Sequence, residues 1–197
     1  ALMGQKKGVA VLSFNWDFVI SGRGPSPDFI HEREELSAVT KFLLKQPGVQ
    51  RKAIYLAGKS LSSLINYSHF QTKPIYKGLF ILSPLCTFRW DHLGREVPPF
   101  SVAFKNYPEL SKVKRNVHFM AGNQNKLCEL PMLFQLIGET SANVSVSTFP
   151  GDEDFNPSTP YQFISNKRPP SNLTLVYSTL LQWLFFYEQT ASAPFLY

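Results

Sequence analysis

Short apolar runs that alternate with helical patterns constrain the fold of this chain more than any other feature. A run in which nearly every residue is apolar is typical of a parallel strand that is buried on both faces. When such strands alternate with helices, the pattern indicates an α/β sheet with right-handed crossovers. The expected strands are residues 9–14, 53–57, 78–82, 117–121 and 144–149.

Helix signals fill the intervals between these runs. Ser26 is expected to cap the first helix, and Pro27 suits the first turn of that helix. Two long segments, 84–108 and 150–172, show no regular pattern, and loops of this length in a compact domain usually carry a site or a partner contact. Three further helices are expected to follow Ser60, Asn125 and Thr174.

Length and composition are those of one globular domain. We expect residues 1–197 to form a single domain. Hydrophobic residues make up 44% of the chain and charged residues 17%, which excludes a disordered protein. The net charge of +6 comes from basic residues that are scattered along the sequence. We therefore expect a solvated basic surface, and nucleic-acid binding is not favoured.

The two cysteines, Cys86 and Cys128, are far apart in sequence and lack the spacing of a metal site. We expect both to be reduced thiols in an intracellular protein that holds no metal and no cofactor. No secretory signal is visible. The apolar stretch 173–187 is too short to span a bilayer, so we expect a packed terminal helix there and no membrane span.

The stretch AIYLAGKSLSS, residues 53–63, has two interpretations. It fits the loose pattern of a phosphate-binding loop, but the residues that would form that loop are apolar and strand-forming, whereas a phosphate loop needs a flexible glycine-rich turn. It also fits a nucleophile elbow, a sharp turn from strand to helix with small residues two positions before and after the nucleophile. Gly58 and Ser62 flank Ser60 in this way. The simpler alternative is a serine that caps a helix.

Segments along most of the chain carry a resemblance to a known group of proteins. The segments, in order, are GVAVLSFNWDFVISGRGPSPD (8–28), YLAGKSLSS (55–63), GLFILSPL (78–85), VHFMAGNQNKLC (117–128) and VSTFPGDEDF (146–155). They resemble a small α/β-hydrolase group of the dienelactone-hydrolase-like superfamily, which includes testis-expressed-thirty-like proteins and a domain of a chromatin acetyltransferase complex subunit. The resemblance implies a mainly parallel sheet flanked by helices. It also implies that residue 1 falls inside the fold, so the family's first strands and their oxyanion loop either lie in a separate part or are lacking, and the domain would be incomplete on its amino-terminal side.

The resemblance also implies where a catalytic triad would lie, and the sequence departs from it. The nucleophile position falls on Ser60, the acid position on Asn125 and the histidine position on Glu153. A triad works because a neutral imidazole accepts the serine proton while the acid orients the ring. A glutamate, with an ordinary pKa of about 4.3, is a poor base for a hydroxyl at neutral pH. The expected triad is therefore degenerate.

Two substitutes for the missing base stay open. His92 lies in the long loop after the third expected strand, and loops at the carboxyl ends of such strands line the site. The second substitute is Glu153, which would act as the base for Ser60 under acidic conditions with help from Asp152 or Asp154.

We expect a non-catalytic protein that acts as a structural or interaction subunit of a larger assembly, with protein partners. The alternative is a serine hydrolase of esterase or thioesterase type with an altered triad, whose substrate would be a small-molecule ester.

Overall fold

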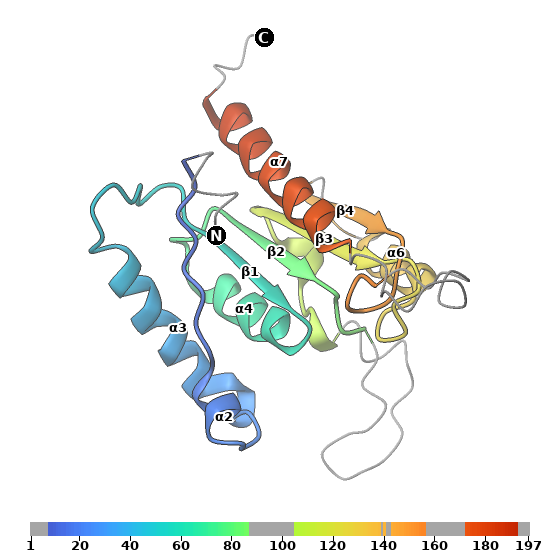
Figure 1. Cartoon of the computed structure of the whole chain (residues 1–197), viewed down its shortest axis with the longest axis horizontal. Helices are drawn as coiled ribbons and strands as arrows, with labels where there is room; N and C mark the ends of the chain where they lie inside the picture. Colours follow the sequence, from blue (N-terminus) through green and yellow to red (C-terminus); the bar gives the residue numbers. More distant parts are fainter. Residues whose placement is uncertain (1–7, 87–104, 139, 141–142, 157–171, 193–197) are drawn as a thin grey trace, which may run out of the picture.

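A computed structural model describes residues 8–86, 105–138, 140, 143–156 and 172–192 (Figure 1). Four parallel strands form one sheet in the order β1-β2-β3-β4, so each strand pairs with the next one in sequence. The strands are β1 (Tyr55–Lys59), β2 (Gly78–Leu82), β3 (Asn116–Gly122) and β4 (Val144–Phe149). The parallel α/β sheet expected from the sequence is confirmed, and four of the five expected strands lie within two residues of their predicted bounds.

Helices cover both faces of this sheet. The helices are α2 (Asp17–Ile20), α3 (Ile30–Leu43), α4 (Leu61–Thr72), α6 (Leu130–Gly138) and α7 (Leu173–Ser192), with 3-10 turns η1 (Pro27–Phe29) and η2 (Leu110–Lys112). Side chains of α3, α4 and α6 share one apolar core, whereas α7 packs against a second core on the other face. Among the described residues, no helix is long and apolar enough to cross a membrane.

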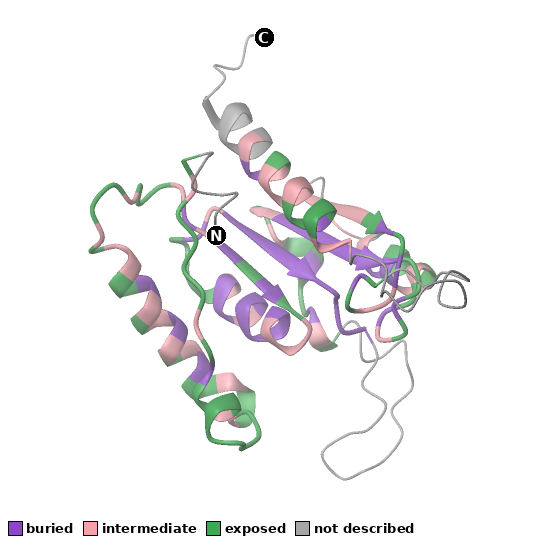
Figure 2. Cartoon of the chain, in the orientation of Figure 1, coloured by how far each residue is buried: buried purple, intermediate pink, exposed green. Residues whose placement is uncertain are grey.

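Strand β2 shows why the strand sequences lack polar residues. Leu79 and Ile81 belong to the core beneath α3 and α4, whereas Phe80 and Leu82 belong to the core beneath α7. Successive side chains of a strand point to opposite faces, so a strand covered on both faces needs apolar residues at every position. All five residues of β2 are buried (Figure 2).

Residues 9–14, expected as the first strand, form no strand in the structure, so this prediction is wrong. The segment is held by side chains instead of a backbone ladder: Phe14 packs on the core, and the Trp16 indole donates a hydrogen bond to the Ser62 hydroxyl at 2.9 Å. Val11 and Leu12 are exposed. Apolar composition therefore predicted an extended segment, but it does not supply the strand partner that a ladder requires.

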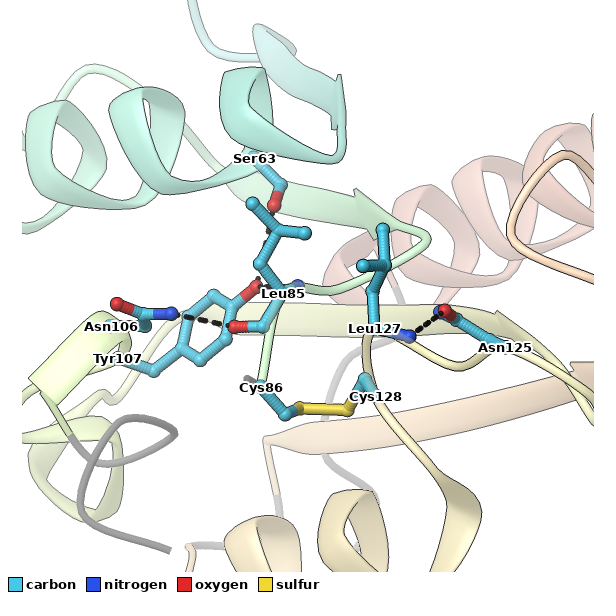
Figure 3. The surroundings of a disulfide bond; sticks show 8 residues. All are labelled: Ser63, Leu85, Cys86, Asn106, Tyr107, Asn125, Leu127 and Cys128. Atoms are coloured by element: carbon cyan, nitrogen blue, oxygen red, sulfur yellow. Dashed lines mark hydrogen bonds between the residues drawn. A yellow bond between two sulfur atoms is a disulfide. The ribbon is translucent and has the colours of Figure 1, made fainter. Parts of the chain in front are cut away.

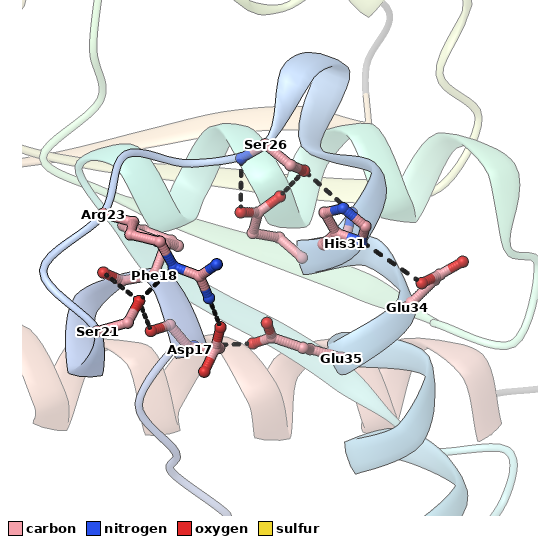
Figure 4. A network of polar contacts seen from close by, with 9 residues as sticks. Asp17, Phe18, Ser21, Arg23, Ser26, His31, Glu34 and Glu35 are labelled. Carbon is pink, nitrogen blue, oxygen red and sulfur yellow. Dashed lines mark hydrogen bonds and ion pairs between the residues drawn. The ribbon is translucent and has the colours of Figure 1, made fainter.

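The helix that the sequence predicts after Ser26, α3, begins a few residues later than expected. Ser26 precedes the 3-10 turn η1, and α3 itself starts at Ile30. The Ser26 hydroxyl accepts a hydrogen bond from the His31 amide, and both the hydroxyl and the amide of Ser26 donate to the Glu32 carboxylate (Figure 4). Burial opposes the charge of Glu32, but these hydrogen bonds outweigh it and hold the pKa of Glu32 below its usual value.

Candidate functional site

Ser60 lies on the tight turn between β1 and α4 and has a strained backbone. Its φ of 52° and ψ of −125° are unfavourable for a residue with a side chain. The turn is held from both sides, since the Ser60 amide donates to the Leu82 carbonyl at 3.0 Å and the Ser63 hydroxyl donates to the Ser60 carbonyl at 2.6 Å. These bonds fix the turn and present the Ser60 side chain at the carboxyl end of the sheet.

Gly58 is required by the close approach of α4 to β1. A Cβ atom at this position would lie 2.6 Å from the Ser62 carbonyl oxygen and 2.7 Å from the Asn66 side-chain nitrogen. A small residue two positions before the turn is what a nucleophile elbow needs. Because residues 55–59 form β1, they cannot form a phosphate-binding loop. The position of Ser60 at the end of this strand, expected from the sequence, is confirmed.

Asn125 lies in the turn after β3, almost completely buried. Its side-chain oxygen accepts a hydrogen bond from the Leu127 amide at 2.8 Å (Figure 3). Its side-chain nitrogen is buried without a hydrogen-bond partner in the described part of the chain. Burying a donor in this way costs about 1–3 kcal/mol. Residues 123–126 and 129–131 line a hollow of about 430 Å³ next to this turn.

Glu153 belongs to the turn after β4, which is built around a neighbouring aspartate. The Asp152 carboxylate accepts hydrogen bonds from the Asp154 amide at 2.8 Å and the Asn156 amide at 2.9 Å. The Ser83 hydroxyl, just after β2, donates to the Glu153 carbonyl. The turn is therefore ordered by its own side chains and by its neighbour at the end of β2.

Further contacts tie this turn to the ends of β1 and β3. Lys59, the last residue of β1, forms an ion pair with Asp154. The Gln124 amide donates to the Gly151 carbonyl at 2.8 Å. Gly122 approaches the same turn so closely that a Cβ atom would lie 2.1 Å from the Asp152 carbonyl oxygen. The ends of all four strands thus form one connected edge.

The structure brings Ser60, Asn125 and Glu153 to this edge without joining their side chains. Within the described residues, the Ser60 hydroxyl makes no hydrogen bond, and neither Asn125 nor Glu153 bonds to it. The roles of these residues as remnants of a triad stay predictions. His92, the substitute base, lies outside the described residues.

The histidines that the structure describes are engaged elsewhere. His31 is exposed near Glu34, and the His69 ring is bonded to the Tyr76 hydroxyl at 3.0 Å. His118 is fully buried in β3 between the hydroxyls of Ser145 and Ser147. Burial lowers the pKa of both His69 and His118 to about 4. None of the three bonds to Ser60.

A disulfide joins Cys86 and Cys128 beside the turn that carries Asn125 (Figure 3), so the prediction of reduced thiols is wrong. Their Cα atoms are 4.6 Å apart, although the residues are 42 positions apart in sequence, and both side chains are fully buried. Each cysteine follows one of two neighbouring parallel strands by a few residues, so both lie at the same edge of the sheet. This topological signal could have predicted the pairing. The expectation of an intracellular protein rested on reduced thiols and loses that support.

The disulfide is part of a larger set of contacts around the site. The Cys86 amide donates to the Leu127 carbonyl at 2.9 Å, next to the Asn125 turn. The Tyr107 hydroxyl accepts a hydrogen bond from the Leu85 amide at 3.1 Å and lies 3.3 Å from the Ser63 hydroxyl. The segment after β2 is thus fixed both to the Asn125 turn and to the first turn of α4. No group of side chains suited to a metal ion occurs among the described residues.

Comparisons with known proteins identify the fold. No protein-family model and no curated protein matches the chain. Among solved structures, the monoacylglycerol lipase of Paleococcus ferrophilus aligns with a TM-score of 0.56 and 14% identity, over 84% of this chain and 77% of the lipase. This chain has an α/β-hydrolase fold.

A second structure with the α/β-hydrolase fold aligns equally well. Est1E from Butyrivibrio proteoclasticus matches with a TM-score of 0.56 and 17% identity, over 80% of this chain and 69% of Est1E. At this identity the likeness concerns the fold and not the activity.

Proposed function

We propose that this chain is a non-catalytic α/β-hydrolase-like protein that acts as a structural or interaction subunit of a larger assembly. The observation that supports the proposal is the strained turn at Ser60 between β1 and α4, taken together with Asn125 and Glu153 at the positions where the resemblance implies the acid and the base. A carboxylate is a far weaker base than imidazole toward a serine hydroxyl at neutral pH. A buried amide at the acid position neither orients an imidazole correctly nor stabilises its charge.

Two further features support the proposal. The Ser60 hydroxyl has no acceptor among the described residues, so nothing described activates it as a nucleophile. The Asp152 carboxylate, which would assist Glu153 under acidic conditions, is occupied by two amides of its own turn. Asp154, the other assistant, is paired with Lys59.

A fluorophosphonate probe tests the proposal directly, because it reports an activated serine without requiring a known substrate. We expect the full chain at neutral pH to show no more labelling than its Ser60→Ala variant. We expect the double variant Asn125→Asp with Glu153→His to be labelled about tenfold faster or more, since it restores an acid and an imidazole. Rapid labelling of the unmodified chain that disappears in Ser60→Ala would contradict the proposal.

A second candidate function, a serine hydrolase of esterase or thioesterase type with an altered triad, is favoured by the strain at Ser60. Strained backbone costs on the order of 1–3 kcal/mol and is found most often at functional sites. In this case the base would be His92 or Glu153. Ser60 labelling lost on His92→Ala would identify the histidine. Labelling that rises under acidic conditions and is lost on Glu153→Gln would identify the glutamate.

A further inference from the structure

Nine of the basic residues that are scattered in sequence lie at one edge of the sheet. Parallel strands all begin at the same edge of a sheet, and the segments that precede β1, β2 and β3 are rich in lysine and arginine. The end of α3 lies near the same edge, where residues 44–54 connect α3 to the start of β1 (Figure 1). We call this surface the basic edge, and it consists of Lys41, Lys45, Arg51, Lys52, Lys73, Lys77, Lys112, Lys114 and Arg115.

Hydrogen bonds make the basic edge one continuous surface. The Lys77 amide donates to the Ile54 carbonyl at 2.8 Å, which joins the segments before β1 and β2. The Arg115 guanidinium donates to the Lys73 carbonyl at 2.8 Å and the Tyr76 carbonyl at 3.0 Å, which joins the segments before β2 and β3. The end of α3 is joined to them by the Thr40 and Tyr76 hydroxyls, 2.6 Å apart.

Acidic residues are segregated from the basic edge. Among the described side chains, Glu109 is the acidic residue that lies there, and it is paired with Lys112 at 2.7 Å. The others belong to the opposite edge of the sheet, to the start of α3 and to the nearby α2, and they are Asp17, Asp28, Glu32, Glu34, Glu35, Glu129, Asp152, Glu153 and Asp154. The basic edge therefore presents a positive field to a partner, and the opposite edge does not.

Two exposed apolar side chains lie among the cations of the basic edge. Phe42, in the last turn of α3 next to Lys41, is 57% exposed. Ile75, between Lys73 and Lys77, is 38% exposed. A nucleic-acid backbone offers phosphates to lysines but nothing apolar to an isoleucine, whereas a peptide can offer both carboxylates and apolar side chains.

We propose that the basic edge docks an acidic protein segment that carries apolar side chains. This inference rests on the proposed interaction function and names the chemistry of the partner. Carboxylates of the segment face the lysines, and its apolar side chains cover Phe42 and Ile75. Because Ser60 lies at the opposite edge of the sheet, docking leaves the candidate site uncovered.

Fluorescence anisotropy of the full chain tests this docking. The probe is a fluorescein-labelled peptide of about 16 residues in which glutamates alternate with leucines, compared with an all-glutamate peptide of equal length. We expect Lys52→Glu with Lys114→Glu to weaken binding of both peptides about tenfold or more. The matched control, Lys105→Glu with Lys126→Glu, changes net charge equally at exposed positions away from the basic edge, and we expect it to weaken binding by less than about threefold.

A separate variant tests the apolar contacts of the basic edge. Phe42→Ser is expected to weaken binding of the leucine-containing peptide and to leave binding of the all-glutamate peptide unchanged. Equal effects on both peptides, or equal effects of the two charge-reversal pairs, would overturn the proposal. Tighter binding of duplex DNA or of phosphatidylserine vesicles at the same salt concentration would also overturn it, as would salt-sensitive self-association of the chain.

The experiments distinguish a failure of the non-catalytic function from a failure of docking at the basic edge. Absence of peptide binding by a chain whose Ser60 is inert contradicts the basic edge and leaves the non-catalytic function intact. Peptide binding by a chain whose Ser60 is labelled contradicts the non-catalytic function and leaves the basic edge intact. Circular dichroism and thermal melting of each variant show whether it is folded before its binding is compared.

Discussion

At the scale of single residues, Ser60 combines a strained backbone with a hydroxyl that makes no hydrogen bond to any residue that the structure describes. Residues of this kind persist where the surrounding structure determines the conformation, and here the Leu82 carbonyl and the Ser63 hydroxyl do so. Gly58 makes the turn possible by leaving room for α4. The strain is therefore imposed by the packing around the turn.

The strain at Ser60 predicts that a glycine variant is more stable than an alanine variant at this position. Glycine adopts a positive φ without steric cost, whereas alanine keeps the Cβ atom that serine has. We expect Ser60→Gly to be more stable than Ser60→Ala by about 1 kcal/mol, although glycine is normally the less stable choice. Urea denaturation of both variants measures the difference. A less stable Ser60→Gly would mean that the turn is not strained in solution.

At the scale of elements, α4 is fixed at both ends. Its start is the elbow at Ser60, and its end is capped by the Arg115 guanidinium, which donates to the carbonyls of Phe70, Lys73 and Tyr76. The guanidinium also stacks over the Phe70 ring, with its central carbon 3.8 Å from the ring centroid. Five donors in a rigid plane suit several carbonyls at once, which a lysine cannot match.

The disulfide between Cys86 and Cys128 is expected to stabilise the folded chain. Joining residues 42 positions apart restricts the unfolded chain, and we expect the double variant Cys86→Ala with Cys128→Ala to lose about 4 kcal/mol of unfolding free energy. Urea denaturation should show that a reducing agent destabilises the unmodified chain and leaves the variant unchanged. Two reactive thiols in the denatured, unreduced chain would refute the disulfide.

At the scale of the whole molecule, two buried histidines link the layers. His69, on α4, joins Tyr76 and through it Thr40 of α3. His118, in β3, bonds to two serines of β4 and lies against the Trp183 ring of α7, with centroids 4.4 Å apart. Both histidines are neutral in the folded chain at neutral pH, because burial lowers their pKa to about 4.

These lowered pKa values predict acid-sensitive folding. The unfolded chain binds protons at His69 and His118 as the pH falls below about 6.5, whereas the folded chain does not until about pH 4. Stability is therefore complete above pH 6.5 and is lost as the pH falls toward 4, by up to about 3 kcal/mol for His118 and by less for His69. The lowered pKa of Glu32 adds a further loss below its unfolded value of 4.5.

Urea denaturation across this pH range checks the prediction. The variant His69→Gln with His118→Gln is expected to be less stable at neutral pH and to lose less stability on acidification. His31→Gln, at an exposed histidine, is the matched control and should follow the unmodified chain. An unmodified chain with the same stability at about pH 7 and pH 5 would contradict burial of neutral histidines.

The sequence by itself determined the local elements and the position of the elbow. The apolar run at β2 predicts its bounds, because a strand covered on both faces must be apolar at each position. The small residue at Gly58 places the turn at Ser60, since steric exclusion between β1 and α4 is a local effect. Periodicity and turn chemistry act over a few residues, and a linear sequence displays them directly.

Tertiary structure alone decided what distant residues do together. It placed Cys86 beside Cys128, kept residues 9–14 out of the sheet and gathered scattered lysines into the basic edge. Each outcome depends on which strands are neighbours, because a parallel sheet brings the ends of separate segments to a common edge. The order of the strands in the sheet therefore decides which distant segments touch. A short stretch of sequence does not contain that information.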